Sequence, residues 1–227
     1  MGDTPSPVLT PSRRALVQRL QAEAAPVRRL WAPGARFGLW LALVAMVGGV
    51  VGLSGVRPDL AQQLHDPVYL LETALLTVAG LAAALLALQE AIPGRAARRL
   101  ERIVPFGLVL VAAVLWFRHP MRGDVAVSQF IATGLGCATS TVGLAALPWC
   151  ALLIAVRRGA PLAPARAGAL LGAAAFFMAA LLMRARCPLD ERLHLLVWHA
   201  LPVAGGTVLS AVVGLAWLRR WRARASR

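Results

Sequence analysis

Six long apolar stretches, separated by segments rich in arginine, constrain this chain more than any other feature of its sequence. A helix that crosses the hydrocarbon core of a bilayer needs roughly 17–25 mainly apolar residues. The stretches cover residues 37–56, 68–88, 103–117, a part of 125–156, 167–183 and 193–218. The third is short, so its flanks must extend it or the bilayer must thin around it. The pattern predicts an all-α, polytopic membrane protein with six transmembrane helices.

The composition supports this fold class, because 59% of the residues are hydrophobic and only 15% are charged. In soluble domains about 45–50% of the residues are apolar and about 25% are charged, so the apolar excess of this chain must face lipid. All 24 basic residues are arginine, and the formal net charge is +14. Such a charge alone would suggest binding to nucleic acid. In a chain this apolar, arginines instead mark the edges of the membrane, and we expect no direct contact with nucleic acid.

The arginines are divided unequally between alternate segments. The segment before the first stretch, the second and fourth loops and the tail hold 18, whereas the other three loops hold six. Because arginine-rich segments stay on the cytoplasmic side, both termini should be cytoplasmic. In a bacterium, the odd-numbered loops would then face the oxidising periplasm. We therefore expect a cytoplasmic segment over residues 1–36, six helices over 37–218 and a basic cytoplasmic tail over 219–227.

A short amphipathic helix is predicted within the amino-terminal segment. Thr10 offers an N-cap, Pro11 suits the first helical position, and no helix-breaking residue follows until Pro26. Alone in water, a helix of about 15 residues is marginal, so it needs a surface to pack against. That surface is either the inner leaflet, with arginines among anionic headgroups, or a groove on a cytosolic protein. The residues that would make the contact are Arg13, Leu16, Val17, Leu20 and Glu23.

Two cysteines are expected at the outward edge of the membrane. If the fourth helix ends at Arg157 and spans about 20 residues, it begins near Cys137, and Cys187 directly follows the fifth stretch. The topology can bring the two sulfurs together, and a disulfide would need Cα atoms about 4.4–6.8 Å apart. Arg184 and Arg186 would stabilise a thiolate at Cys187. The alternative is that Cys137 is only a small apolar residue at the interface and that Cys187 is an incidental thiol in a loop.

The third cysteine and the histidines carry weaker signals. Cys150 lies well inside the fourth stretch, where we expect it to pack against other helices. Three histidines, His65, His119 and His194, fall in or beside outward loops, where soft or borderline metals could find imidazole and thiolate ligands. Their spacing matches no fixed metal-binding motif, so the sequence assigns no metal site and no cofactor.

Glu72 is the one acidic residue well within an apolar stretch. A transporter would use such a group for a proton or cation, whereas the alternative is an ion pair with an outer-loop arginine. Catalytic signatures are absent, since the chain has no CxxC, HExxH, GxSxG or phosphate-binding glycine loop. We therefore expect no enzyme. A small transporter using Glu72 and a thiol-dependent membrane redox protein remain as alternatives to a regulator.

Several short motifs, in this order and spacing, resemble those of the NrsF family of membrane-embedded anti-sigma factors. The resemblance covers almost the whole chain from Leu16 onward. The motifs are PVRRL at 26–30, LSGVRPDL at 53–60, Asp66-Pro67, LLE at 70–72, Gly136-Cys137, RRGAPLAPARAG at 157–168, Cys187-Pro188 and Trp198-His199.

The resemblance implies an inner-membrane regulator whose cytoplasmic segment, 1–36, holds an extracytoplasmic-function sigma factor away from RNA polymerase. In the family, two outward cysteines take part in sensing heavy metals or oxidants, and they map onto Cys137 and Cys187. A heavy-metal ion or an oxidant would then be the signal. We hypothesise that it shifts the fourth and fifth helices relative to each other and so changes how the amino-terminal helix is presented.

Overall fold

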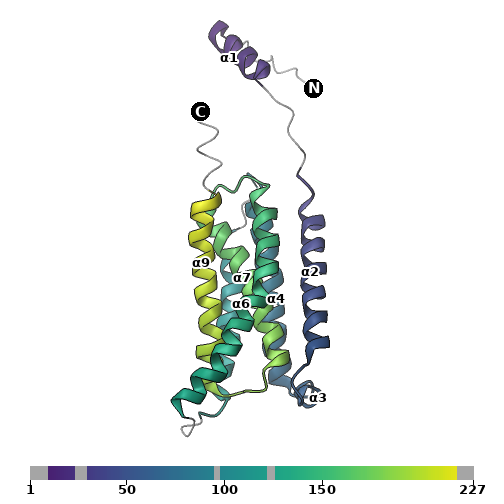
Figure 1. Ribbon diagram of the computed structural model, residues 1–227. Helices are drawn as coiled ribbons and strands as arrows, with labels where there is room; N and C mark the ends of the chain where they lie inside the picture. Colours follow the sequence, from purple (N-terminus) through teal and green to yellow (C-terminus); the bar gives the residue numbers. More distant parts are fainter. Residues whose placement is uncertain (1–9, 24–29, 95–97, 122–125, 219–227) are drawn as a thin grey trace. The chain divides into compact units, whose positions relative to one another are not determined.

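A computed structural model describes residues 10–23, 30–94, 98–121 and 126–218 (Figure 1). Every regular element within these ranges is helical. The chain forms two compact units, Met1–Leu30 and Trp31–Arg227. The predicted tail, residues 219–227, lies outside the described residues.

The amino-terminal unit contains α1 (Pro11–Ala22), which begins at the predicted proline. It ends at Ala22, with Glu23 as its C-cap, and the remaining residues of the predicted helix, 24 and 25, lie outside the described part of the chain. No residue of α1 is buried, and the apolar side chains of Leu16 and Leu20 are 57% and 60% exposed. This helix of 12 residues therefore leaves its apolar side chains exposed, and a helix of this length is marginal alone.

The second unit has six helices that are long and apolar enough to cross a membrane, as predicted. The short third stretch is extended by its flanks, since the helical segment there runs over Arg99–Arg118. The elements are α2 (Pro33–Ser54), α3 (Leu60–Gln63), α4 (Pro67–Glu90), α5 (Arg99–Leu115), the 3-10 helix η1 (Trp116–Arg118), α6 (Val127–Arg157), α7 (Pro164–Arg186), α8 (Arg192–His194), the π-helix η2 (Leu195–Ala200) and α9 (Leu201–Leu218).

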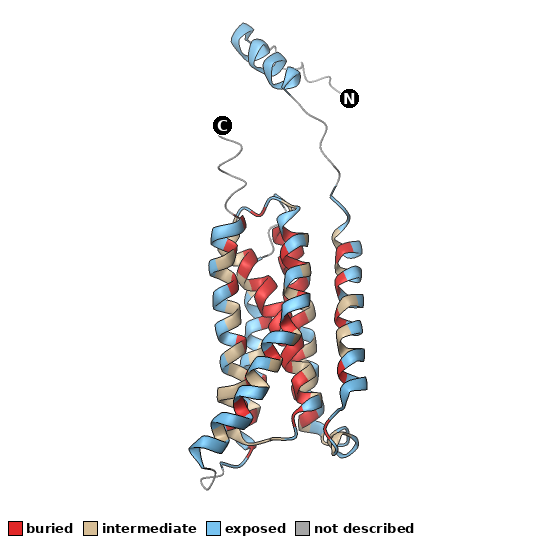
Figure 2. Ribbon diagram, viewed as in Figure 1, coloured by how far each residue is buried: buried red, intermediate tan, exposed pale blue. Residues whose placement is uncertain are grey.

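Helix α7 forms the centre of the bundle. Most of its residues are buried, whereas few residues of α2 and α9 are (Figure 2), and few residues of α5 are buried either. Alanine and glycine dominate α7, and small residues let helix backbones approach closely. At Gly168, a Cβ atom would overlap the carbonyl oxygen of Ser210 in α9. The close packing of α7 against α9 therefore depends on glycine at this position.

The fourth span differs from its prediction in two ways. It begins at Val127 and not near Cys137, because no proline interrupts the chain between these residues, so Cys137 lies in its third turn. In addition, Cys150 is exposed on the surface of the bundle, although we expected it to pack inside. The neighbouring Leu152 takes the buried position.

Helix α2 begins, and helix α9 ends, beside the last turn of α6. Arg36 Nη1 in α2 donates to the carbonyl oxygen of Ala155 over 3.1 Å, and the Arg157 guanidinium lies 4.7 Å from the ring centroid of Trp217 in α9. The start of α2 and the end of α9 thus lie at the same end of the bundle, as an even number of crossings requires (Figure 1). We call the opposite end, where Cys187 follows α7, the cysteine end.

At the cysteine end, the turn after α2 is bound to the end of α7. Gly55 follows α2 with a φ of 110°, a conformation that glycine adopts without steric cost. Two residues later, the backbone N–H of Arg57 donates to the carbonyl oxygen of Ala185 over 3.0 Å. This hydrogen bond places the loop after α2 directly beside the segment that carries Cys187.

Candidate functional site

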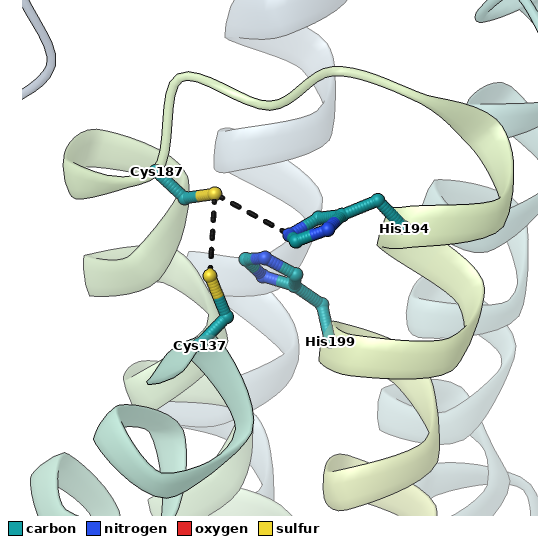
Figure 3. Close-up of side chains that lie close together, drawn as sticks. All are labelled: Cys137, Cys187, His194 and His199. Carbon is teal, nitrogen blue, oxygen red and sulfur yellow. Dashed lines mark hydrogen bonds between the residues drawn. The ribbon is translucent and has the colours of Figure 1, made fainter. Parts of the chain in front are cut away.

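The structure brings Cys137 and Cys187 together at the cysteine end. Cys137 lies in the third turn of α6, and Cys187 is the residue that caps α7. Their Sγ atoms are 3.5 Å apart, and both are free thiols (Figure 3). A disulfide bond is about 2.05 Å long, so a small movement of either side chain would allow the bond to form.

Two histidines complete the cluster. His194 Nε2 lies 3.5 Å from the Sγ atom of Cys187. The ring of His199 lies beside that of His194, with centroids 5.4 Å apart, and both rings face the sulfurs (Figure 3). One ligand atom from each of the four residues lies within 4.8 Å of the other three. Two thiols and two imidazoles are a ligand set that soft and borderline metals prefer.

The π-helix η2 explains why the two histidines face the same way. They are five positions apart, and at 3.6 residues per turn an α-helix would separate them by about 140° around its axis. In a π-helix, residue i hydrogen-bonds to residue i+5, so these positions stack on one face. His199 was missing from the histidines noted in the sequence, because those lie in or beside the outward loops, and α-helical winding would also have turned it away from His194.

Both histidines are buried, with 2% and 1% of the surface of His194 and His199 exposed. Neither ring nitrogen of His199 has a hydrogen-bond partner within the described residues. The thiol of Cys137 and the ring of His194 lower the pKa of the Cys187 thiol, against the effect of burial, because hydrogen-bond donors stabilise a thiolate. The site therefore favours a nucleophilic or metal-binding sulfur at Cys187.

The loop that follows Cys187 is held by ion pairs. Asp190 binds Arg184 in α7 and Arg57 in the loop after α2, and the distance from Arg57 Nη2 to Asp190 Oδ2 is 2.5 Å. Arg57 also binds Asp59 over 2.7 Å and is 2% exposed. Although burial opposes the shifts, these contacts raise the pKa of the Arg57 guanidinium and lower the pKa of the Asp190 carboxyl. The group stays ionised at neutral pH and fixes the loop beside the cysteines.

Arg184 and Arg186, which were expected to stabilise a thiolate at Cys187, bind other groups. Neither has the Cys187 thiol as its partner, because carboxylates and a hydroxyl elsewhere bind them. Arg184 Nη2 lies 2.9 Å from Glu72 Oε2, and Arg186 Nη1 donates to Ser54 Oγ over 3.2 Å. The other Glu72 oxygen lies 3.7 Å from Arg118 and 3.6 Å from His119. The alternative that Glu72 pairs with an arginine is thus confirmed, and its place in ion pairs favours a structural role over transport.

An open hollow gives access to the sulfurs. It has a volume of about 470 Å³ and is lined by one face of α6 near Cys137 and by the chain from Arg186 to Leu189. Small ions or oxidants could reach the two thiols through it. The sequence assigned no metal site, and of the three histidines noted beside the outward loops only His194 belongs to the cluster: His119 lies near Glu72, and His65 lies in the loop before α4.

The five residues expected to bind a partner all lie in or directly after α1. Each is exposed, and the side chains of Leu16, Val17 and Leu20 form one apolar stripe. The structure contains no partner chain, so their role stays a prediction.

Comparison with known proteins identifies the family. The sequence profile of NrsF, described as negative regulator of sigma F, matches residues 20–221. The chain is 31% identical over 211 residues to the anti-sigma-F factor NrsF of Caulobacter vibrioides (strain NA1000 / CB15N). The aligned region covers 88% of this chain and 92% of that protein. No solved structure matches the chain. A match over most of both sequences shows that the chain belongs to the NrsF family of negative regulators of sigma F.

Proposed function

We propose that this protein is an inner-membrane anti-sigma factor controlled by its paired cysteines. Its segment 1–36 would hold an extracytoplasmic-function sigma factor at the cytoplasmic face. Cys137 and Cys187 would sense metal or oxidative stress in the periplasm and trigger release. The observation that carries this proposal is the 3.5 Å approach of the two sulfurs beside an open hollow, in a chain of the NrsF family.

The distribution of arginine supports the orientation. The start of α2 and the end of α9 share one end of the bundle, and the arginine-rich segments adjoin it: 18 arginines belong to this side and six to the other. The positive-inside rule places the richer side in the cytoplasm. Both termini, including the tail 219–227, would then be cytoplasmic, and the cysteine end would face the periplasm.

The exposure of α1 supports the proposal that the sigma factor binds to this helix. Its apolar stripe is uncovered, and an amphipathic helix of this kind gains stability by placing its apolar face in a groove of another protein. Arg13 and Glu23 flank the stripe and would fix the orientation of the helix in that groove.

The contacts at the cysteine end suggest how the signal travels. Asp190, three residues after Cys187, binds Arg57, and Arg186 donates to Ser54 at the end of α2. Helix α2 leads back to the amino-terminal segment. Bond formation or metal binding at the cysteines would bias one of two arrangements of α6 and α7 that differ by only a few kcal/mol, and α2 would carry the change to α1.

The test uses the full chain in cells that carry a reporter gene transcribed only with the sigma factor. We expect the wild-type chain to repress the reporter until Cd²⁺ or chromate is added. The double variant Cys137→Ser/Cys187→Ser should keep it repressed, and the control Cys150→Ser should respond as wild type does. An unchanged response in the double variant would refute the sensing role. Failure of the purified sigma factor to bind the full chain in detergent would refute sequestration.

A further inference from the structure

We propose that Cys137, Cys187, His194 and His199 together bind one divalent metal ion of the soft or borderline class, such as Zn²⁺ or Cd²⁺. This inference deepens the proposed sensing function and rests on it for its biological role. It adds to the two cysteines a pair of histidine ligands from the last helix.

The distances fit a tetrahedral site. Zinc binds sulfur at about 2.3 Å and imidazole nitrogen at about 2.0–2.1 Å, which places the ligand atoms of a tetrahedral site roughly 3.3–3.8 Å apart. The Cys137–Cys187 and Cys187–His194 separations are both 3.5 Å. All four ligand atoms already lie within 4.8 Å of one another. Small adjustments of the side chains would therefore complete the coordination.

His199 supplies independent support. It is 1% exposed, yet neither of its ring nitrogens has a hydrogen-bond partner within the described residues. Buried polar groups in proteins are nearly always paired, and its ring faces the two sulfurs (Figure 3). A metal ion would pair one of these nitrogens. Moreover, the π-helix that turns His199 toward the cluster is a rare element that occurs often at functional sites.

The balance of charge favours a divalent ion. Binding would release one proton from each thiol, so that two thiolates and two neutral imidazoles surround the cation and the complex carries no net charge. The adjacent Arg184 is already paired with Glu72 and Asp190, and so adds no uncompensated charge. A neutral complex is the form that a mostly buried site tolerates best.

Metal binding and disulfide formation would have different structural effects. A disulfide would join only α6 to the end of α7, whereas a four-ligand metal site would also bind η2 at the start of the last span. The histidines are therefore required for the response to a metal ion but not for the response to an oxidant.

The first experiment titrates the reduced full-length protein in detergent with Co²⁺ as a spectroscopic probe and then displaces it with Cd²⁺. We expect one ion per chain and the strong visible absorption of tetrahedral cobalt with thiolate ligands. The variant His194→Ala/His199→Ala should bind at least about tenfold more weakly, since even outer-shell changes at metal sites cost 10–100-fold. The matched controls His65→Ala and Cys150→Ser should bind as wild type does.

A second measurement does not depend on the folding of a variant. X-ray absorption of the Zn²⁺-loaded wild-type protein should show two sulfur and two nitrogen ligands. A shell dominated by sulfur or oxygen, or equal Co²⁺ affinity in the double-histidine variant, would overturn the four-ligand site.

The reporter assay separates this inference from the proposed function. If the wild-type chain binds the ion through all four residues but Cd²⁺ does not release the sigma factor, the metal-sensing function fails and the site stands. If the double-histidine variant still releases the sigma factor on Cd²⁺ and binds the ion as tightly as wild type, the site fails and the sensing function of the cysteines stands.

Discussion

Arg57 and Asp190, which lie 133 positions apart, form a partly buried ion pair that joins the loop after α2 to the loop after Cys187. The Arg57 side chain is 1% exposed. Its second partner, Asp59, lies on its own loop, so Asp190 makes the connection between the two segments. The pair therefore links the cysteine site to the end of α2.

Replacing Asp190 by asparagine should weaken this connection. Breaking a fully buried ion pair by removing one partner costs about 3–5 kcal/mol, and we expect a smaller loss here because Asp190 is 20% exposed and Asp59 remains bound to Arg57. The response of the reporter to Cd²⁺ should also fall, since among the polar contacts of the described residues only the Arg186–Ser54 and Arg57–Ala185 hydrogen bonds then hold the end of α2 to the segment around Cys187. Thermal unfolding in detergent and the reporter assay measure the two effects.

Asp59→Asn is the matched control, because it removes the more exposed partner of the same arginine. It should cost less stability and leave the response to Cd²⁺ intact. Equal effects of the two variants would show that the link between the loops has no special role.

The same carboxyl predicts a dependence on pH. Arg57 and Arg184 lower the pKa of Asp190 below its ordinary value of 3.8, although burial opposes them. A group whose pKa is lowered by folding stabilises the native state fully above its unfolded pKa, and this contribution is lost as the pH falls through the folded value. The difference in stability between wild type and Asp190→Asn should thus stay constant from neutral pH to about pH 5. Below pH 4 it should shrink.

Unfolding temperatures of both proteins, measured over this range in one detergent, test the prediction. If the difference in unfolding temperature between wild type and Asp190→Asn already narrows between pH 7 and pH 6, the prediction is contradicted. Such a result would indicate that a histidine controls the stability of the cysteine end.

Gly134 in α6 controls the approach of the π-helix to the cysteines. A Cβ atom at this position would overlap the indole of Trp198, the residue before His199. Gly134→Ala should therefore push η2 away from α6, cost about 1–3 kcal/mol as overpacking does, and weaken Co²⁺ binding. Gly143→Ala in the same helix is the control, because no atom lies within 4 Å of its Cβ position. Equal metal affinity in the two variants would show that this contact does not position His199.

Much of the fold could be predicted because it follows from local composition. The six spans follow from the length of apolar segments that must face lipid, and the approach of Cys137 to Cys187 follows from two antiparallel helices joined by a short loop. The start of α6 was missed because an apolar run does not show where a helix leaves the membrane.

The site was predicted only in part, since its remaining features depend on contacts that are distant in the sequence. Arg184 turns away from Cys187 because Glu72 and Asp190 attract it, and neither pairing leaves a local signal. His199 joins the site because one segment of the last span is wound as a π-helix. Periodicity arguments assume α-helical winding, so they assign this histidine to another face.

The apolar stripe of α1 gives the most direct test of sigma-factor binding. Leu16 and Leu20 are four positions apart and exposed, so they lie on one face of the helix. Leu20→Glu should reduce the affinity of the full chain for the sigma factor at least about 30-fold, the equivalent of a hot-spot loss of about 2 kcal/mol. Gln18→Glu introduces the same charge on the opposite face and should leave the affinity unchanged. Binding of the purified sigma factor to each full-length variant in lipid nanodiscs measures the effect. Equal affinities would exclude the stripe as the contact, and a loss confined to nanodiscs with anionic lipid would indicate instead that α1 lies on the membrane surface.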